Sequence, residues 1–369
     1  MQNVQGQETI GIRQFTILVM IFTIGSSILV APSGLAAGAR QDAWIAAIAG
    51  TGVSMLFIWL YGKLGGYFPQ LTLVEYSEKL LGVWLGKLVA LLFAGYFFLL
   101  ASLLLREIGD FITTQMMPET PIQYVHILFL TIVVWAVRLG IEPITRTGEL
   151  FLPVISLLFL ILVLFLVPDI RPTNVLPVLE NGLLPIVKAG IPFLGLPFLE
   201  LVVFLMLLPN VNRKEKVHKA FFLGTLAGSF FIVLISFMSI AVLGADFTER
   251  HLYPSYALAK QINVGNFFQR VEVLIGAIWL LTIFFKMAIC LYAALLGIAQ
   301  TLRLKSYRPL SLPMAMIMLA VSLFVSPNIT FFNTFISKQW TPFSMTFGLV
   351  LPLLLLGIGA VKKRKRGGD

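Results

Sequence analysis

One lysine stands in the middle of a long apolar stretch, where a charged side chain could hold an ion or exchange a proton. Lys286 lies in RVEVLIGAIWLLTIFFKMAICLYAALLGIAQTLR, 16 residues after Arg270 and 17 before Arg303. In a helix this separation places Lys286 roughly 24 Å from either charged end, beyond the reach of its side chain. A lysine so placed needs a partner or must lose its proton. We therefore expect Lys286 to face the interior of the protein.

A candidate partner is Glu200, the only acid well inside a predicted span, which comes three residues after Pro197. Two roles for its carboxylate fit this position. It could cap free backbone amides in the first turn of a half-helix, where the helix dipole favours negative charge. It could equally contact Lys286 directly.

Two apolar segments contain residues that interrupt a helix. Gly25, Ser26 and Ser27 stand in the first, and Gly190-Ile-Pro-Phe-Leu-Gly-Leu-Pro197 stands in the sixth. Glycine and proline weaken a helix, and unpaired backbone groups persist in a membrane only where protein or ligand satisfies them. The breaks could therefore present amides and carbonyls to a small polar ligand. Small residues also serve close helix packing, which is the alternative explanation.

The elements that must position these residues are membrane helices. The chain has 369 residues, of which 58% are hydrophobic and 12% charged. Apolar runs of about 20 residues recur along nearly its whole length, as expected for a polytopic membrane protein. We predict ten spans, over residues 13–34, 41–62, 82–106, 122–138, 146–167, 185–209, 218–245, 269–302, 309–326 and 340–361.

Basic residues predict the orientation of these spans. They gather in alternate loops, notably at 213–219 and in the tail KKRKR at 362–366, whereas the other loops hold fewer, Arg106 among them. The positive-inside rule therefore places both termini in the cytoplasm. The tail could be a stop-transfer anchor or a binding patch for anionic membrane lipids. The net charge of +10 is explained by these loops, so no nucleic-acid partner is expected.

The loop at 65–86 is predicted to form a short interfacial helix.

Several classes of function have no support in the sequence. There is one cysteine, Cys290, and the three histidines lack metal-ligand spacing, so neither a metal nor a cofactor is expected. No GxxxxGK[ST] motif occurs, and no nucleophile–base pair can be assembled inside the spans. We therefore predict that the protein is not an enzyme.

The two interrupted spans, numbers one and six, occupy matching positions if the chain consists of two halves of five spans. An odd number of spans inserts the second half upside down, and matching breaks in such halves point to a substrate site near the bilayer midplane. The sequence thus predicts one all-α transmembrane domain with a five-plus-five inverted repeat. The repeats cover about 13–167 and 185–361, followed by a basic tail at 362–369.

The motifs TIGSSIL in span one, GLPFLE in span six and PNVNRKEKVHKA after it resemble the B subunit of spore nutrient germinant receptors. Those proteins belong to the amino acid, polyamine and organocation transporter superfamily. The resemblance covers almost the whole chain and implies substrate binding between spans one, three, six and eight. It also implies a spore inner-membrane location, an A-type membrane subunit and a C-type lipoprotein as partners. Gly25 to Ile28 and Gly195 to Phe198 match the two unwound regions of the family.

The candidate ligand-binding residues come from these regions, with one residue each from spans three and eight added. They are Gly25, Ser26, Ser27, Ile28, Tyr96, Gly195, Leu196, Pro197, Phe198 and Thr282. For Lys286 three interpretations stay open. It could be a permanent ammonium in place of the sodium ion that relatives bind between spans one and eight, a group that releases a proton during transport, or a lock between helices. The first and third are preferred, because a receptor need not cycle.

The favoured function is a nutrient-sensing subunit that binds a small germinant, such as an amino acid, and passes a conformational change to partner subunits. The main alternative is an amino acid permease or a proton-coupled symporter. A third is a subunit of an ion or water channel, in which the central lysine would disfavour cations.

Overall fold

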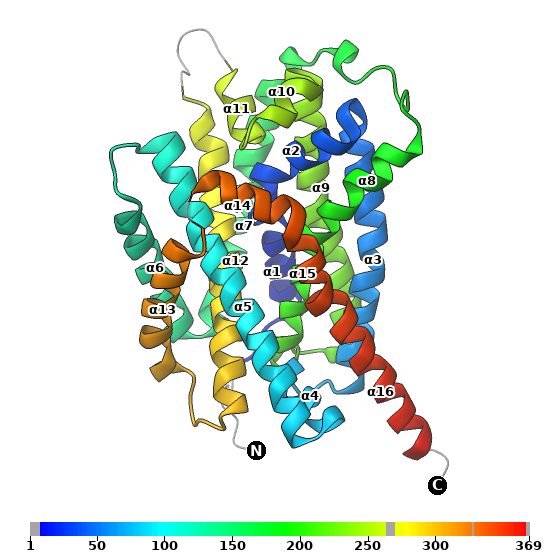
Figure 1. Ribbon diagram of the computed structural model, residues 1–369, viewed down its shortest axis with the longest axis vertical. Coiled ribbons are helices and arrows are strands. Elements are labelled where there is room, and N and C mark those ends of the chain that lie inside the picture. The colour runs from blue at the N-terminus through cyan, green and yellow to red at the C-terminus, as the bar shows by residue number, and fades with distance from the viewer. Residues whose placement is uncertain (1–7, 263–269, 327, 367–369) are drawn as a thin grey trace.

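The computed structural model describes residues 8–262, 270–326 and 328–366, with side chains up to Lys362. Within these ranges every regular element is a helix, apart from an isolated bridge between Ile10 and Val211. The long helices run side by side in one bundle, and α1 begins at the same end of the bundle as α16 ends (Figure 1). Residue 269, the expected start of span eight, and residues 367–369 of the tail lie outside the described residues.

The helices follow the predicted order of spans. Eight helical stretches of the described residues are long and apolar enough to cross a membrane, and two shorter apolar helices cover Ile12–Ile24 and Arg308–Phe324. In chain order the spans correspond to α1 (Ile12–Ile24) with α2 (Ser27–Ala39), α3 (Ala43–Tyr67), α5 (Val83–Phe111), α6 (Ile122–Leu139), α7 (Ile141–Leu166), α8 (Leu183–Phe193) with Leu194–Met206, α9 (Val217–Leu243), α12 (Glu272–Thr301), α13 (Ser311–Phe324), and α14 (Ile329–Phe335), α15 (Thr341–Met345) and α16 (Leu351–Arg366).

Two predicted boundaries are wrong. Span ten was expected to begin at residue 340, but the helical stretch begins at Ile329 and includes Lys338, which was expected in a loop. Span three was expected to end at residue 106, with Arg106 in a loop, but α5 continues to Phe111 and leaves Arg106 only 8% exposed. The local hydropathy is lowered by three charged residues close together, Arg106, Glu107 and Asp110, so the sequence pattern indicates a loop where the helix continues. The helix continues because the charges find partners inside the protein, as described below.

Short helices cover both ends of the bundle. The expected interfacial helix is present as α4 (Leu73–Leu81), which begins with Thr72 and Glu75 in a capping box. Lys362 of α16 donates to the carbonyl of Leu80 and holds the last span against α4. At the opposite end α10 (Ala245–Arg250) and α11 (Pro254–Lys260) lie beside α2 (Figure 1).

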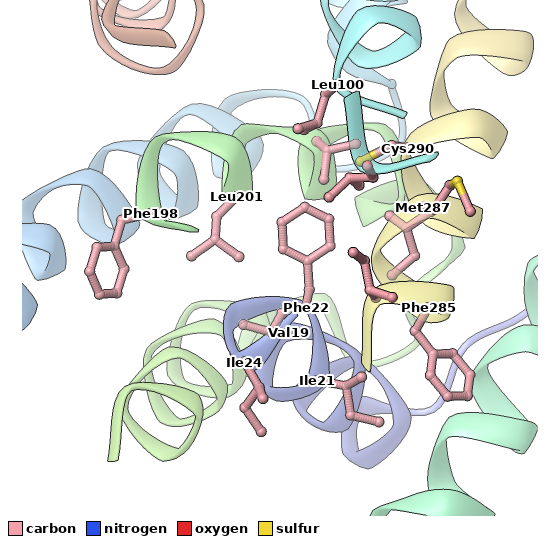
Figure 2. Close-up of a cluster of buried hydrophobic side chains, with 14 of the residues drawn as sticks. Val19, Ile21, Phe22, Ile24, Leu100, Phe198, Leu201, Phe285, Met287 and Cys290 are labelled. Carbon is pink, nitrogen blue, oxygen red and sulfur yellow. The ribbon is translucent and has the colours of Figure 1, made fainter. Parts of the chain in front are cut away.

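The centre of the bundle is α12, which packs against α5, α1, α7 and α6. From Phe285 to Leu296 each of its side chains is fully buried. Figure 2 shows Phe22 pointing from α1 into a cluster of apolar side chains contributed by span six and α12. Phe22 also packs edge to face on Phe204, and the rings of Phe15, Phe204 and Phe221 pack edge to face or tilted on one another.

The segment before α1 ties several helix ends together. Ile10 donates to the carbonyl of Asn210 and accepts from the amide of Asn212. Glu8 accepts from the amide of Ile141, at the first turn of α7, and lies 3.6 Å from Arg308. This end of the bundle is therefore held closed by backbone and side-chain bonds.

Candidate functional site

Span one breaks where the sequence predicted. Gly25 adopts φ 25° and ψ −127°, which a residue with a side chain rarely adopts, and α2 begins at Ser27. The predicted unwound stretch is too long at its far end, because Ser27 and Ile28 are already helical. The break is confined to Gly25 and Ser26.

The carbonyl groups freed in span one find side-chain partners. The hydroxyl of Thr282 on α12 donates to the carbonyl of Gly25 at 3.2 Å. Pro32 has no amide to offer the carbonyl of Ile28 four residues earlier, and Ser255 of α11 donates to that carbonyl at 2.7 Å. The break is thus satisfied by the protein itself, as the membrane interior requires. One group is left over: the buried hydroxyl of Ser27 has no hydrogen-bond partner among the described residues.

Span six also breaks where predicted. Leu196 has extended backbone angles, φ −133° and ψ 109°, inside an otherwise helical stretch, and its bond to Pro197 is cis. Gly195 lies against span ten: an added Cβ would fall 3.0 Å from Cα of Thr341. Gly195 therefore serves close packing, which was the alternative explanation for a small residue here.

Lys286 and Glu200 form a fully buried ion pair between span eight and span six. Nζ of Lys286 lies 2.6 Å from Oε2 of Glu200, and both side chains are 0% exposed. The ammonium also donates to Oγ of Ser26 at 2.9 Å and lies 5.3 Å from the ring centre of Phe22. Of the two roles considered for Glu200, the structure shows the direct contact with Lys286.

A further hydrogen bond extends this pair to span ten. Nε1 of Trp340 donates to Oε1 of Glu200 at 2.8 Å. Trp340, Glu200, Lys286 and Ser26 therefore form a continuous polar chain that joins spans ten, six, eight and one. The aliphatic stem of Lys286 fills the space at the break itself, because a Cβ on Gly25 would meet its Cδ at 2.6 Å.

A cavity of about 640 Å³ adjoins the polar chain at Trp340. Its walls come from α2, α8 and the segment from α14 to Trp340. Exposed residues such as Gly34 and Lys188 line its mouth. Leu196, Trp340 and Glu107 also line it. The cavity therefore reaches both the break in span six and the first member of the polar chain.

Most of the predicted ligand-binding residues do not line this cavity. Leu196 does, whereas Gly25, Ser26, Ser27, Ile28, Gly195, Pro197, Phe198 and Thr282 are buried in the packed region beneath it. Tyr96 does not line it either, although its ring stacks on that of Trp340 at 5.9 Å. Its ring stacks on Phe347 at 4.5 Å, and its hydroxyl donates to Ser344 at 3.3 Å.

The sequence reading missed three charged residues on α5 and wrongly took Glu200 as the only acid well inside a span. Arg106 pairs with Asp110 at 2.9 Å and donates to the carbonyl of Ser326 at 2.6 Å, which fastens α5 to the end of α13. Glu107 between them lines the cavity. The spacing of Arg106 and Asp110, four residues apart with Phe111 next, is the signal of a continuing helix with an internal ion pair.

The described residues contain no group of three or more His, Cys, Asp and Glu side chains able to hold a metal ion. What the site offers instead is a cavity, two helix breaks and a buried polar chain between them. Such an arrangement suits the binding of a small solute and the coupling of that binding to helix movement.

Comparison with known proteins places this architecture in a family. Residues 9–330 match the model of a family described as "Spore germination protein". Spore germination protein KB of Bacillus subtilis is 31% identical over 361 residues, which cover 97% of this chain and 96% of the relative. Spore germination protein YndE of the same organism is 25% identical over 356 residues, which cover 96% of each chain.

Solved structures show the same fold. Mhp1, a nucleobase-cation-symport-1 family transporter in a closed conformation with bromovinylhydantoin bound, gives a TM-score of 0.73 at 15% identity, over 96% of this chain and 79% of Mhp1. MhsT in complex with L-phenylalanine gives 0.67 at 14% identity, over 92% and 88% of the two chains. The predicted fold class, a multi-span helical transporter fold, is confirmed.

Proposed function

This chain belongs to the spore germination protein family, and we propose that it is the nutrient-sensing B-type subunit of a germinant receptor, without catalytic activity. It is an integral membrane protein with multiple spans. Its proposed ligand is a small germinant, such as an amino acid. The proposed partners are an A-type membrane subunit and a C-type lipoprotein, in the spore inner membrane with both termini on the core side. Two inverted repeats, 13–167 and 185–361, remain our interpretation of the chain.

One observation carries this proposal: Trp340, the first residue of the polar chain, also lines the cavity. Trp340 lines the cavity and donates to Glu200, which pairs with Lys286, which in turn bonds Ser26 at the break in span one. A solute that moves Trp340 or Leu196 would disturb contacts among spans one, six, eight and ten. Binding that favours one arrangement of these spans over another is the physical requirement for sensing.

The Lys286 contacts support two of its three interpretations. An ammonium held by Glu200 and Ser26 acts as a fixed positive charge between spans one, six and eight, and it also locks those spans together. In a sensor, ligand binding would change these contacts of Lys286 and so allow spans one, six and eight to move relative to one another. The free hydroxyl of Ser27, next to this lock, is a further group that a bound ligand could reach after the spans move.

The test is to block the cavity without disturbing the packing. A Cβ on Gly34 meets no atom within 4 Å, and Gly34 lines the cavity, so Gly34→Trp should fill the cavity and leave the fold intact. Gly52→Trp is the matched control, since Gly52 is also exposed on a helix with nothing within 4 Å but does not line the cavity. The measurement is dipicolinate release from spores that carry each variant as their sole receptor of this type.

We expect Gly34→Trp spores to lose the response to one nutrient in a panel of amino acids, sugars and nucleosides, while Gly52→Trp spores keep it. An unchanged response in Gly34→Trp spores would refute the cavity as the sensing site. Uptake of labelled amino acids by proteoliposomes, many molecules per protein, would instead support the permease alternative.

A further inference from the structure

Glu107 is a buried acid that forms no ion pair among the described residues. Its side chain is 7% exposed, it lines the cavity, as Trp340 does, and its buried Oε1 has no hydrogen-bond partner among the described residues. A buried carboxylate oxygen without a partner is costly. Its neighbours one residue before and three residues after, Arg106 and Asp110, are already paired with each other.

The count of buried charges around the cavity leaves Glu107 uncompensated. Lys286 is balanced by Glu200, and Arg106 by Asp110. Lys188 lines the same cavity, but it is an exposed residue of α8 at the mouth. A positive group entering the cavity would therefore meet a buried carboxyl oxygen that no other side chain occupies.

We propose that Glu107 is the contact for the protonated primary amine of the solute that occupies this cavity. This inference rests on the proposed sensing function and narrows its ligand to amine-bearing solutes. An ammonium at Glu107 would replace the missing hydrogen bond and compensate the charge. The remaining walls are largely apolar, with Ala31, Leu35 and Phe193 among them, and suit the uncharged part of an amino acid or a related small amine.

The amine proposal is tested on the full chain in lipid nanodiscs at pH 7. Binding of L-alanine, L-valine, L-asparagine and L-phenylalanine is measured by thermal stabilisation and by calorimetry. Each is compared with its N-acetyl derivative, which keeps the side chain but lacks the ammonium. Methylammonium chloride, potassium chloride and glucose complete the panel, as an amine alone, a cation without an amine and a solute without charge.

The decisive variant is Glu107→Gln, which keeps the size of the side chain and removes its charge. Its matched control is Glu272→Gln, because Glu272 is also only 8% exposed and lies in the first turn of α12, but it does not line the cavity. We expect an amino acid of the panel to bind wild type and Glu272→Gln alike, and Glu107→Gln about tenfold more weakly or worse. Should Glu107→Gln fail to fold, wild type alone decides, because each N-acetyl derivative should bind at least about tenfold more weakly than its parent.

Three results would overturn the proposal. One is equal binding of the amino acid by wild type and Glu107→Gln. Another is equal binding of an amino acid and its N-acetyl derivative. The last is stabilisation of wild type by glucose or potassium chloride alone, or by no member of the panel. The proposed sensing function fails separately, if the amine binds through Glu107 while spores without this gene respond to every nutrient as before.

Discussion

The side chain of Lys286 lies directly over Gly25, so that a Cβ at Gly25 would fall 2.6 Å from its Cδ. The two residues are 261 positions apart in the chain, yet the side chain of Lys286 occupies the space that a side chain at Gly25 would need. The break in span one is therefore supported by span eight, and the two spans act as one unit at this level. The ammonium beyond that contact reaches Ser26 and Glu200.

Replacing Lys286 should leave Glu200 as a buried charge without a partner. We expect Lys286→Met to destabilise the protein by about 3–5 kcal/mol, the usual cost of breaking one side of a buried pair. Thermal unfolding of the purified protein in detergent measures this loss. The double variant Lys286→Met/Glu200→Leu should recover much of the stability, since no charge is then buried. A single variant as stable as wild type would show that the pair contributes little to the fold.

At Gly25 even a methyl group should be harmful. Gly25→Ala places a Cβ 2.6 Å from both Lys286 Cδ and the carbonyl oxygen of Phe22, and its φ of +25° is unfavourable for alanine. We expect a loss of about 1–3 kcal/mol and a lost nutrient response. Gly52→Ala, in open space and outside the cavity, is the control and should behave as wild type. Equal melting temperatures of the two variants would contradict this account of the break.

Gly195→Leu should also abolish the response, but through packing. Its side chain would collide with Thr341 and separate span six from span ten, so the melting temperature should fall together with the response. In Gly34→Trp the response should be lost at an unchanged melting temperature. Measuring both quantities on both variants separates a packing defect from a blocked cavity, and a stable Gly195→Leu protein would show that this contact can relax.

Glu8 should give a pH dependence to the stability of the closed end of the bundle. Burial raises the pKa of Glu8 above its ordinary value of 4.5, although the amide of Ile141 and the charge of Arg308 oppose the rise. Between 4.5 and the raised value the folded state holds more protons than the unfolded state, so stability contributed by this group falls as pH increases. Melting temperatures of wild type and Glu8→Gln, measured from pH 4 upward, should show wild type losing stability relative to the variant across that window. A constant difference would mean that folding leaves the Glu8 pKa unchanged.

The sequence was sufficient to predict the fold class, the order of spans and both helix breaks, because hydropathy, glycine and proline report directly on the membrane environment. It also predicted that Lys286 faces inward, since no other position for a midplane lysine is affordable in free energy. The partner of Lys286 stayed open between two roles, because contacts between spans six and eight depend on helix rotation that spacing does not fix.

The cavity could not be predicted from the sequence. Its acid, Glu107, follows Arg106 in a stretch whose low hydropathy resembles a loop. The burial of this stretch and its contacts, such as that of Arg106 with Ser326, show that it lies inside the protein. The breaks drew attention to Gly25 and Gly195, but in this structure the space near them is filled by Lys286 and Thr341. Whether the space beside a helix break is open or filled depends on side chains from other spans, and the sequence pattern of one span does not report it.

The bonds that the segment before α1 makes with Asn210, Asn212 and Ile141 have a quantitative consequence for what the cavity can report. A compartment closed at one end equilibrates with the solution at the other end alone. Its fractional occupancy then depends on a single concentration and a single dissociation constant, whatever the solute gradient across the bilayer. Under the proposed sensing function, such a compartment would report the concentration of its solute without consuming any of it.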